Sequence, residues 1–254
     1  MPQELQDRVA LSAKDLLHYS DPCSLGIFDL SRTVEAVATT SISRLAVDLN
    51  RPPYHLAPGH PDGVVKTRTV DGRAVYREGR FPDPRLIHRI LLRHYFPYHD
   101  GIDRTIDTGR VRIGIDCHTM LPVGPPAHRD AGRKRPLICL GNNGDAEGNP
   151  LPGRLTTCPP AWLQALSREF VREFPLPGAV RLNDPFAGGF VCIMHFWRRG
   201  VPWIQLEVNR ALFEGTSPDE VPAPGSARLR DLRDRVERAL LGFWEGVRDS
   251  PEPG

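Results

Sequence analysis

Three stretches of this chain combine a short apolar run with groups that can hold a metal ion, polarise water or bind a carboxylate. The three stretches are Asp48-Leu49-Asn50-Arg51, Asp116-Cys117-His118 and Gln205-Leu206-Glu207-Val208-Asn209-Arg210. They lie far apart in the sequence. Each apolar run is typical of a β-strand, and open α/β sheets bind their ligands at the carboxyl ends of strands. The pattern therefore predicts that the three stretches converge into one hydrolytic site.

His118 and Glu207 are the main candidates for chemistry. An imidazole at a strand end can bind a metal ion, although a hydrogen-bonded histidine at the edge of the core is the commoner explanation of a single histidine. A carboxylate inside the apolar run around Glu207 costs free energy unless it has a partner or a task. Strand alternation also allows Glu207 to point outward and pair with Arg210, so both interpretations stay open.

Polar side chains near the same runs could bind an acidic substrate. The guanidinium of Arg51 is planar and matches a carboxylate in shape. Its alternative role is a structural ion pair with Asp48 or Asp116, and most surface arginines have no specific role. The further candidates for anion binding are Asn50, Arg44 and Arg210.

His18 and Asp21 are further candidates for metal binding, because they are separated by two residues, a spacing seen in some paired ligands. The alternative is that Asp21 only caps a helix. Cys117, beside His118, would suggest a cysteine hydrolase. Adjacent side chains of a strand point to opposite faces, so we expect Cys117 to be a buried thiol.

The elements that would position these residues follow from capping and periodicity. Ser12 and Asp15 form a capping sequence for a short helix, Asp21 would cap a second helix, and Asp83-Pro84 begins a third. Helical spacing recurs over residues 162–174 and 228–243. Strands are expected at residues 40–49, 111–116, 136–140, 179–182 and 201–208, and a hairpin at residues 64–76 around Asp71-Gly72.

Alternating strands and helices predict a three-layer α/β/α domain with a mixed, mainly parallel central sheet. A chain of 254 residues is long enough to form one such domain without disulfide support. The segment 141–160, rich in Gly, Asn and Pro, is too long for a plain connection and is expected to form part of the site.

Composition excludes few partners but suggests a compartment. Lys plus Arg (33) nearly balances Asp plus Glu (31), so charge gives no argument for a nucleic-acid or membrane partner. The 5 cysteines show no CxxC spacing, which fits reduced thiols and a cytoplasmic location. No apolar stretch approaches the roughly 20 residues that cross a bilayer. The sequence indicates no particular oligomeric state.

Taken in order, the motifs of this chain resemble those of the N-formylglutamate amidohydrolase family from about Asp21 to Phe213. They occupy residues 43–52, 97–99, 115–120, 140–141, 157–158, 183–189 and 205–210. The family is similar in fold to the zinc carboxypeptidases and aspartoacylases, a phosphorylase/hydrolase-like architecture with a mixed sheet between helical layers.

The resemblance implies zinc-dependent hydrolysis of the amide bond of N-formyl-L-glutamate or a similar acidic N-acyl amino acid, a late step of histidine degradation in some bacteria. It implies that His118 is a zinc ligand and that Glu207 is the general base. Asn50 and Arg51, and with them Arg44 and Arg210, would hold the carboxylates of the substrate.

The chain departs from the family at its beginning. Family members typically carry a Pro-His-Ser-Gly motif whose histidine looks like the first zinc ligand, and this motif is absent from the sequence. Either the chain begins at an internal methionine or another group binds the metal. We therefore expect a single domain over residues 1–254 without the usual first strand, in which Asp21, His118 and, as the nearest substitute, His18 bind zinc or another divalent metal.

Two other functions fit the same motifs. One is a related zinc amidohydrolase that acts on another N-acyl amino acid or on a γ-glutamyl peptide. The other is a non-catalytic member that binds an acidic metabolite or a partner, which the missing histidine motif favours.

Overall fold

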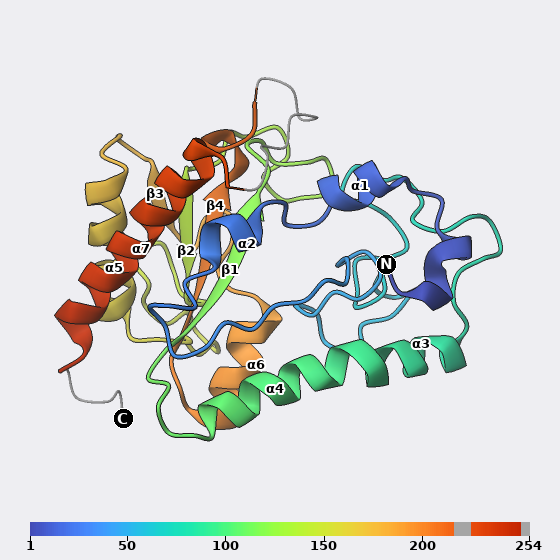
Figure 1. Ribbon diagram of the computed structural model, residues 1–254, viewed down its shortest axis with the longest axis horizontal. Coiled ribbons are helices and arrows are strands. Elements are labelled where there is room, and N and C mark those ends of the chain that lie inside the picture. The colour runs from blue at the N-terminus through green and yellow to red at the C-terminus, as the bar shows by residue number, and fades with distance from the viewer. Residues whose placement is uncertain (216–224, 250–254) are drawn as a thin grey trace.

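The computed structural model describes residues 1–215 and 225–249 (Figure 1). The α-helices are α1 (Ala13–His18), α2 (Ser24–Phe28), α3 (Pro84–Ile90), α4 (Phe96–Ile106), α5 (Pro160–Glu173), α6 (Phe190–Arg199) and α7 (Ala227–Val247). Other helical turns are the 3-10 segments η1 (Gln3–Arg8) and η3 (Arg210–Leu212) and the π-helical segment η2 (Leu91–Tyr95). The strands are β1 (Gly114–Met120), β2 (Ile138–Gly141), β3 (Val180–Leu182) and β4 (Trp203–Asn209).

The strands form one mixed sheet in the order β1-β4-β2-β3. β1 is parallel to β4 and β2 is parallel to β3, while β2 and β4 are antiparallel. Every residue of β2 and β4 is buried, as expected for strands that are covered on both faces. The register pairs Met120 with Asn209, so β1 and β4 finish at the same edge of the sheet.

Helices cover both faces of this sheet, which confirms the predicted three-layer architecture (Figure 1). α5, α7 and α2 lie on one side, where Phe170, Val236 and Leu206 belong to the main core. α6 and α4 lie on the other side, where Val191 and Ile102 pack with Trp203 in a smaller core. No helix within residues 1–215 and 225–249 is long and apolar enough to span a membrane.

A second core lies beside the sheet and contains few regular elements. It buries Leu45, Ala46 and Val47 against residues such as Val64 and Ile87. The prediction of a strand at residues 40–49 is wrong, because this apolar run forms turns in which the carbonyl of Ser43 accepts from the next buried amides. The run is apolar because it faces the second core and not because it joins the sheet.

Local capping signals predicted two helix starts correctly and one incorrectly. Ser12 and Asp15 form a capping box at α1, and the Asp83 side chain accepts from the Leu86 amide at α3. Asp21 does not cap α2, whose N-cap residue is Cys23 with a positive φ of 60°. The carboxylate of Asp21 binds elsewhere, as described below.

The remaining predicted elements are mostly present with shifted ends. β1 begins later than expected and continues through Met120, so His118 lies inside the strand. The expected hairpin is reduced to one antiparallel bridge between Arg68 and Ala74, closed by Gly72 at a φ of +90°. Helix α6 was not predicted at all.

Candidate active site

His118 and Glu207 lie side by side on the parallel strands β1 and β4. The register pairs them directly, and residues paired in register on adjacent strands project from the same face of a sheet. The exposed fraction of Glu207 is 6%, so its carboxyl group is withdrawn from bulk water. Residues 89 positions apart in sequence, at 118 and 207, thus meet because two strands pair.

The imidazole of His118 lies between two carboxylates. Its Nδ1 is 3.2 Å from Oδ2 of Asp21, and its Nε2 is 3.0 Å from Oδ1 of Asp116. Burial alone would lower the pKa of His118, but the charges of Asp116 and Asp21 outweigh burial and raise this pKa well above its usual value. His118 is therefore a buried cation in this arrangement.

Asp21 joins β1 to the segment that precedes α2. Its Oδ1 accepts from the Thr119 amide at 3.2 Å, and its Oδ2 is 3.5 Å from the guanidinium of Arg44. Burial alone would raise the pKa of Asp21, but the positive charges of Arg44 and His118 outweigh it and hold the pKa well below its usual range. The carboxylate is therefore ionised.

Asn50 connects the turn at residues 48–51 to both β1 and α6. Its Nδ2 donates to Oδ2 of Asp116 at 2.9 Å and lies 3.0 Å from Nε2 of His118. Its Oδ1 accepts from the Val191 amide at 2.8 Å, at the beginning of α6. The side chain thus fixes Asp116 and caps a helix at once.

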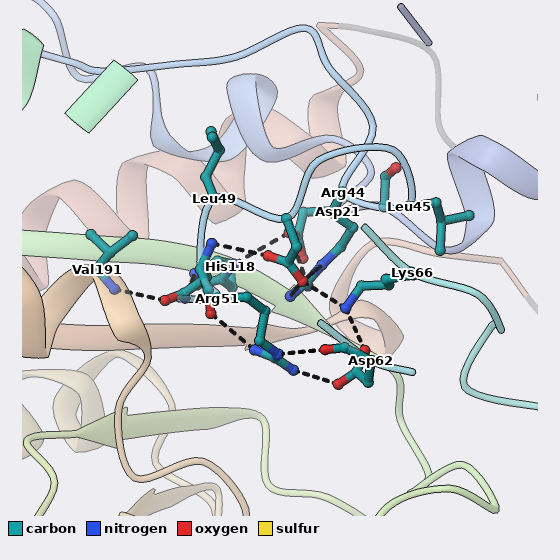
Figure 2. Close-up of polar contacts among 12 residues, drawn as sticks. Asp21, Arg44, Leu45, Leu49, Arg51, Asp62, Lys66, His118 and Val191 are labelled. Carbon is teal, nitrogen blue, oxygen red and sulfur yellow. Dashed lines mark hydrogen bonds and ion pairs between the residues drawn. The ribbon is translucent and has the colours of Figure 1, made fainter. Parts of the chain in front are cut away.

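A series of negatively and positively charged side chains leads from Asp48 toward the surface (Figure 2). Asp48, 2% exposed, accepts from Arg44 at 3.1 Å and from Lys66 at 2.8 Å. Lys66 also forms an ion pair with Asp62. Nη2 of Arg51 lies 2.7 Å from Oδ2 of the same aspartate. Arg51 is therefore in an ion pair with Asp62, and not with Asp48 or Asp116 as the sequence suggested.

Glu207 has the environment of a proton acceptor near neutral pH. Burial raises its pKa to about 7, and the nearby charge of His118 offsets only part of this effect. Gln205, two residues earlier on the same face of β4, donates to Oε1 of Glu207 at 3.0 Å. This contact orients the carboxyl group without adding charge.

The arginine candidates fall into two groups by exposure. The side chains of Arg44 and Arg51 are 30% and 33% exposed, so both are partly accessible from solvent. Arg210 is 4% exposed and donates to the backbone carbonyls of His18 (at 2.7 Å) and Ser20. Arg210 thus anchors the end of α1.

The metal candidates were His118, Asp21 and His18. His18 ends α1, packs edge-on against Tyr19 and lines an open cavity of about 600 Å³. Within residues 1–215 and 225–249, no three His, Cys, Asp or Glu side chains form a group that could hold a metal ion. The described residues therefore do not fit a three-ligand zinc site, and zinc stays a prediction.

Sequence reasoning missed several residues of this network. Lys66 had a usable signal, because a lysine directly after the apolar pair at 64–65 is at risk of burial and then needs carboxylate partners. Gln205 was noted only as part of a motif. His99 was noted only within the motif at residues 97–99, and it lies inside α4 with 2% exposure.

Comparison with known proteins gives a family and a fold. A family model described as N-formylglutamate amidohydrolase matches residues 1–214. The chain is similar to the crystal structure of N-formylglutamate amidohydrolase from Ralstonia eutropha JMP134, with a TM-score of 0.66, 19% identity and coverage of 95% of this chain and 89% of that chain. It is also similar to a gene product from Agrobacterium tumefaciens, with a TM-score of 0.59, 21% identity and coverage of 96% and 86%. No curated protein matches.

Proposed function

Because this chain belongs to the N-formylglutamate amidohydrolase family, we propose that it hydrolyses the amide bond of N-formyl-L-glutamate or of a similar acidic N-acyl amino acid. The observation that carries the proposal is the pairing of Glu207 with His118 on adjacent strands, with Glu207 buried and no cation bonded to its carboxyl group in any described contact. Such a carboxylate is costly to bury without a task.

Glu207 is the proposed proton carrier. A general base works best when its pKa lies near the operating pH, and burial places the pKa of Glu207 at about 7. The ionised carboxylate takes a proton from the attacking water and then gives it to the leaving amine. Gln205 keeps the carboxyl group in one orientation during both transfers.

Arg44 and Arg51 are the proposed carboxylate-binding residues, with Asn50 between them and the strands. Both guanidiniums are half-buried, and each is already oriented by an aspartate. A planar fork held in this way loses little freedom when it binds a second carboxylate. Arg210 was a candidate on the same footing as Arg44 in the sequence, but its burial favours an anchoring role over substrate contact.

Zinc belongs to the proposal only through the family resemblance. Asp21 and His118 are the two residues that would bind it, and a third ligand is not among the described side chains. We therefore assign no step of the reaction to a metal. A site with two protein ligands should hold zinc weakly.

A second candidate function is a non-catalytic member of the family that binds an acidic metabolite. The position of His118 favours it, because both ring nitrogens already face carboxylates. In that case the buried cation at 118 would serve only to join β1, Asp21 and Asp116. The Arg44 and Arg51 side chains would still bind the metabolite.

Release of free glutamate, the product that hydrolysis of all three substrates below has in common, separates these candidates. We would assay the purified protein with N-formyl-L-glutamate, N-acetyl-L-glutamate and a γ-glutamyl peptide, measure bound metal at equilibrium, and titrate glutamate by calorimetry. Turnover of one substrate that is lost in Glu207→Gln supports the hydrolase. Binding of glutamate without turnover of any substrate, with or without added zinc, supports the non-catalytic member and contradicts the hydrolase.

A further inference from the structure

The turn at residues 48–51 carries much of the proposed site but belongs to no helix or strand. Asn50 reaches β1 and α6 from this turn, and Arg51 reaches Asp62. Side chains on irregular backbone are held less precisely than those on helices and strands, unless other groups fix the backbone. The groups that fix this turn are therefore part of the site.

Two side chains of one helix bind the two carbonyl groups that flank Asn50. Tyr95 Oη donates to the carbonyl of Arg51 at 2.8 Å, and Nε2 of His99 lies 3.1 Å from the carbonyl of Leu49. Residues four apart share a helix face, so both contacts come from the same side. Tyr95 and His99 are 1% and 2% exposed, which shields both hydrogen bonds from water.

We propose that Tyr95 and His99 are positioning residues that hold the turn at residues 48–51 by its backbone and thereby aim Asn50 at Asp116 and His118. The inference about catalysis rests on the proposed function, whereas the placement of Asn50 does not. Because Asn50 also caps α6, loss of the clamp should be visible at the Val191 amide even without substrate.

The π-helical segment η2 supports this assignment. A π turn holds one residue more than an α turn, which rotates the following helix by about 100°. π turns are rare and are frequently found at functional sites. Here the segment ends at Tyr95 and immediately precedes α4, so it sets the direction in which Tyr95 and His99 point.

The ring of His99 is fixed from its other side. Its Nδ1 lies 3.1 Å from Nε2 of His195 on α6, and Nδ1 of His195 lies 2.7 Å from Oδ1 of Asp103 on α4. Burial lowers the pKa of His99 to about 4, so the ring is neutral and has one proton. A hydrogen bond from His99 to the Leu49 carbonyl requires this proton on Nε2.

The test uses substitutions that remove a single hydrogen bond. Tyr95→Phe deletes one oxygen atom, and His99→Leu deletes the donor, whereas His99→Gln keeps an N–H near the position of Nε2. Tyr76→Phe is the matched control, because Tyr76 is also buried but its hydroxyl has no hydrogen-bond partner among the described residues. Hydrogen exchange at Val191 and formate release are measured in each variant.

We expect exchange at Val191 to rise at least about fivefold in Tyr95→Phe and His99→Leu, as for the loss of one hydrogen bond, while amides in α7 are unchanged. Tyr76→Phe should match the parent, and His99→Gln should recover most of the protection. In the parent, the ¹⁵N spectrum should show His99 protonated on Nε2. If formate is released at all, kcat/KM should fall about tenfold in the same two variants.

Unchanged exchange at Val191 in Tyr95→Phe overturns the proposal, and so does a His99 ring protonated on Nδ1. Should His99→Leu fail to fold, Tyr95→Phe decides alone, since its ring packing is retained. A parent that releases glutamate from none of the three substrates contradicts the proposed function, while exchange at Val191 still decides the clamp.

Discussion

At the scale of single residues, the site separates the pKa values of its carboxyl groups. Two nearby cations hold the pKa of Asp21 well below its usual range. Burial, in contrast, raises the pKa of Glu207 to about 7. Groups whose environments push their pKa values apart are often those with different roles in proton transfer. Their surroundings thus favour Asp21 as a fixed charge and Glu207 as the proposed proton carrier.

The pH profile of formate release should depend on Glu207. Because the base must be ionised, we expect kcat/KM to rise as the pH increases through about 7. Glu207→Gln should lower kcat by about 10²–10⁴-fold and abolish this rise of kcat/KM with pH. Glu245→Gln, an exposed position in α7, is the control. A Glu207→Gln enzyme with parental turnover would remove Glu207 from the mechanism.

Lys66 should contribute strongly to stability. It is 4% exposed and lies 2.8 Å from the buried carboxylate of Asp48. Lys66→Met leaves Arg44 as the main partner of Asp48, and breaking a buried pair typically costs about 3–5 kcal/mol. We would measure the free energy of unfolding in urea, with the exposed Lys134→Met as control. An equal decrease of the free energy of unfolding in Lys66→Met and Lys134→Met would contradict the expectation.

At the scale of elements, local signals in the sequence predicted some starts and missed others for a physical reason. The caps of α1 and α3 are supplied by neighbouring residues, so sequence shows them. The N-cap residue of α6 is Gly189, which has no side chain, and the hydrogen-bond acceptor comes from Asn50, 141 residues before Val191. No local pattern reveals a cap supplied by the tertiary fold.

The same distinction explains how much of the site was predictable. His118 and Glu207 were predicted as candidates because a polar group inside an apolar strand is unusual. Their pairing depends on the register of β1 and β4, which sequence periodicity does not fix. Residues 40–49 gave a false strand because an apolar run indicates burial, and the second core buries it as turns.

Gly189 should be sensitive to the smallest substitution. A Cβ at this position would lie 2.2 Å from the side-chain nitrogen and oxygen of Asn50. Gly189→Ala should displace Asn50, leave the Val191 amide unpaired and cost about 1–3 kcal/mol of stability, with at least about tenfold slower formate release.

The control for this prediction is Gly246→Ala in α7, where an added Cβ would meet nothing within 4 Å. Because Gly246 lies in the last turn of α7, this variant should be as stable as the parent or slightly more stable. Calorimetric melting compares the two proteins. Parental stability and turnover in Gly189→Ala would show that Asn50 moves aside without consequence, contrary to the expectation.

At the scale of the whole molecule, the site lies where two cores meet. β1 and β4 belong to the sheet and the main core, whereas the turn at residues 48–51 follows a run buried in the second core. Phe190 packs against the second core. The next residue, Val191, belongs to the smaller core that contains Ile102 and Trp203. The side-chain contacts of Asn50 therefore connect the turn beside the second core to β1 and α6.

The buried carboxyl groups should give the folded protein a stability maximum in mildly acid solution. Asp21 and Asp48 have lowered pKa values because nearby cations outweigh burial, so their contribution is complete above about pH 4 and is lost as the pH falls. Glu207 has a raised pKa, so stability is lost as the pH rises from its ordinary value of 4.5 through about 7.

Urea unfolding across this range tests both signs. We expect the free energy of unfolding to be highest at about pH 4–4.5, to fall in more acid solution, and to fall again as the pH rises from about 4.5 to about 7. Glu207→Gln should be more stable than the parent at about pH 8, by on the order of 3 kcal/mol, and equal to it at about pH 4, because only the ionised carboxylate is costly to bury. Glu245→Gln should follow the parent throughout. A Glu207→Gln protein whose stability declines between about pH 4.5 and 7 as steeply as that of the parent would mean that the cost arises from another buried group.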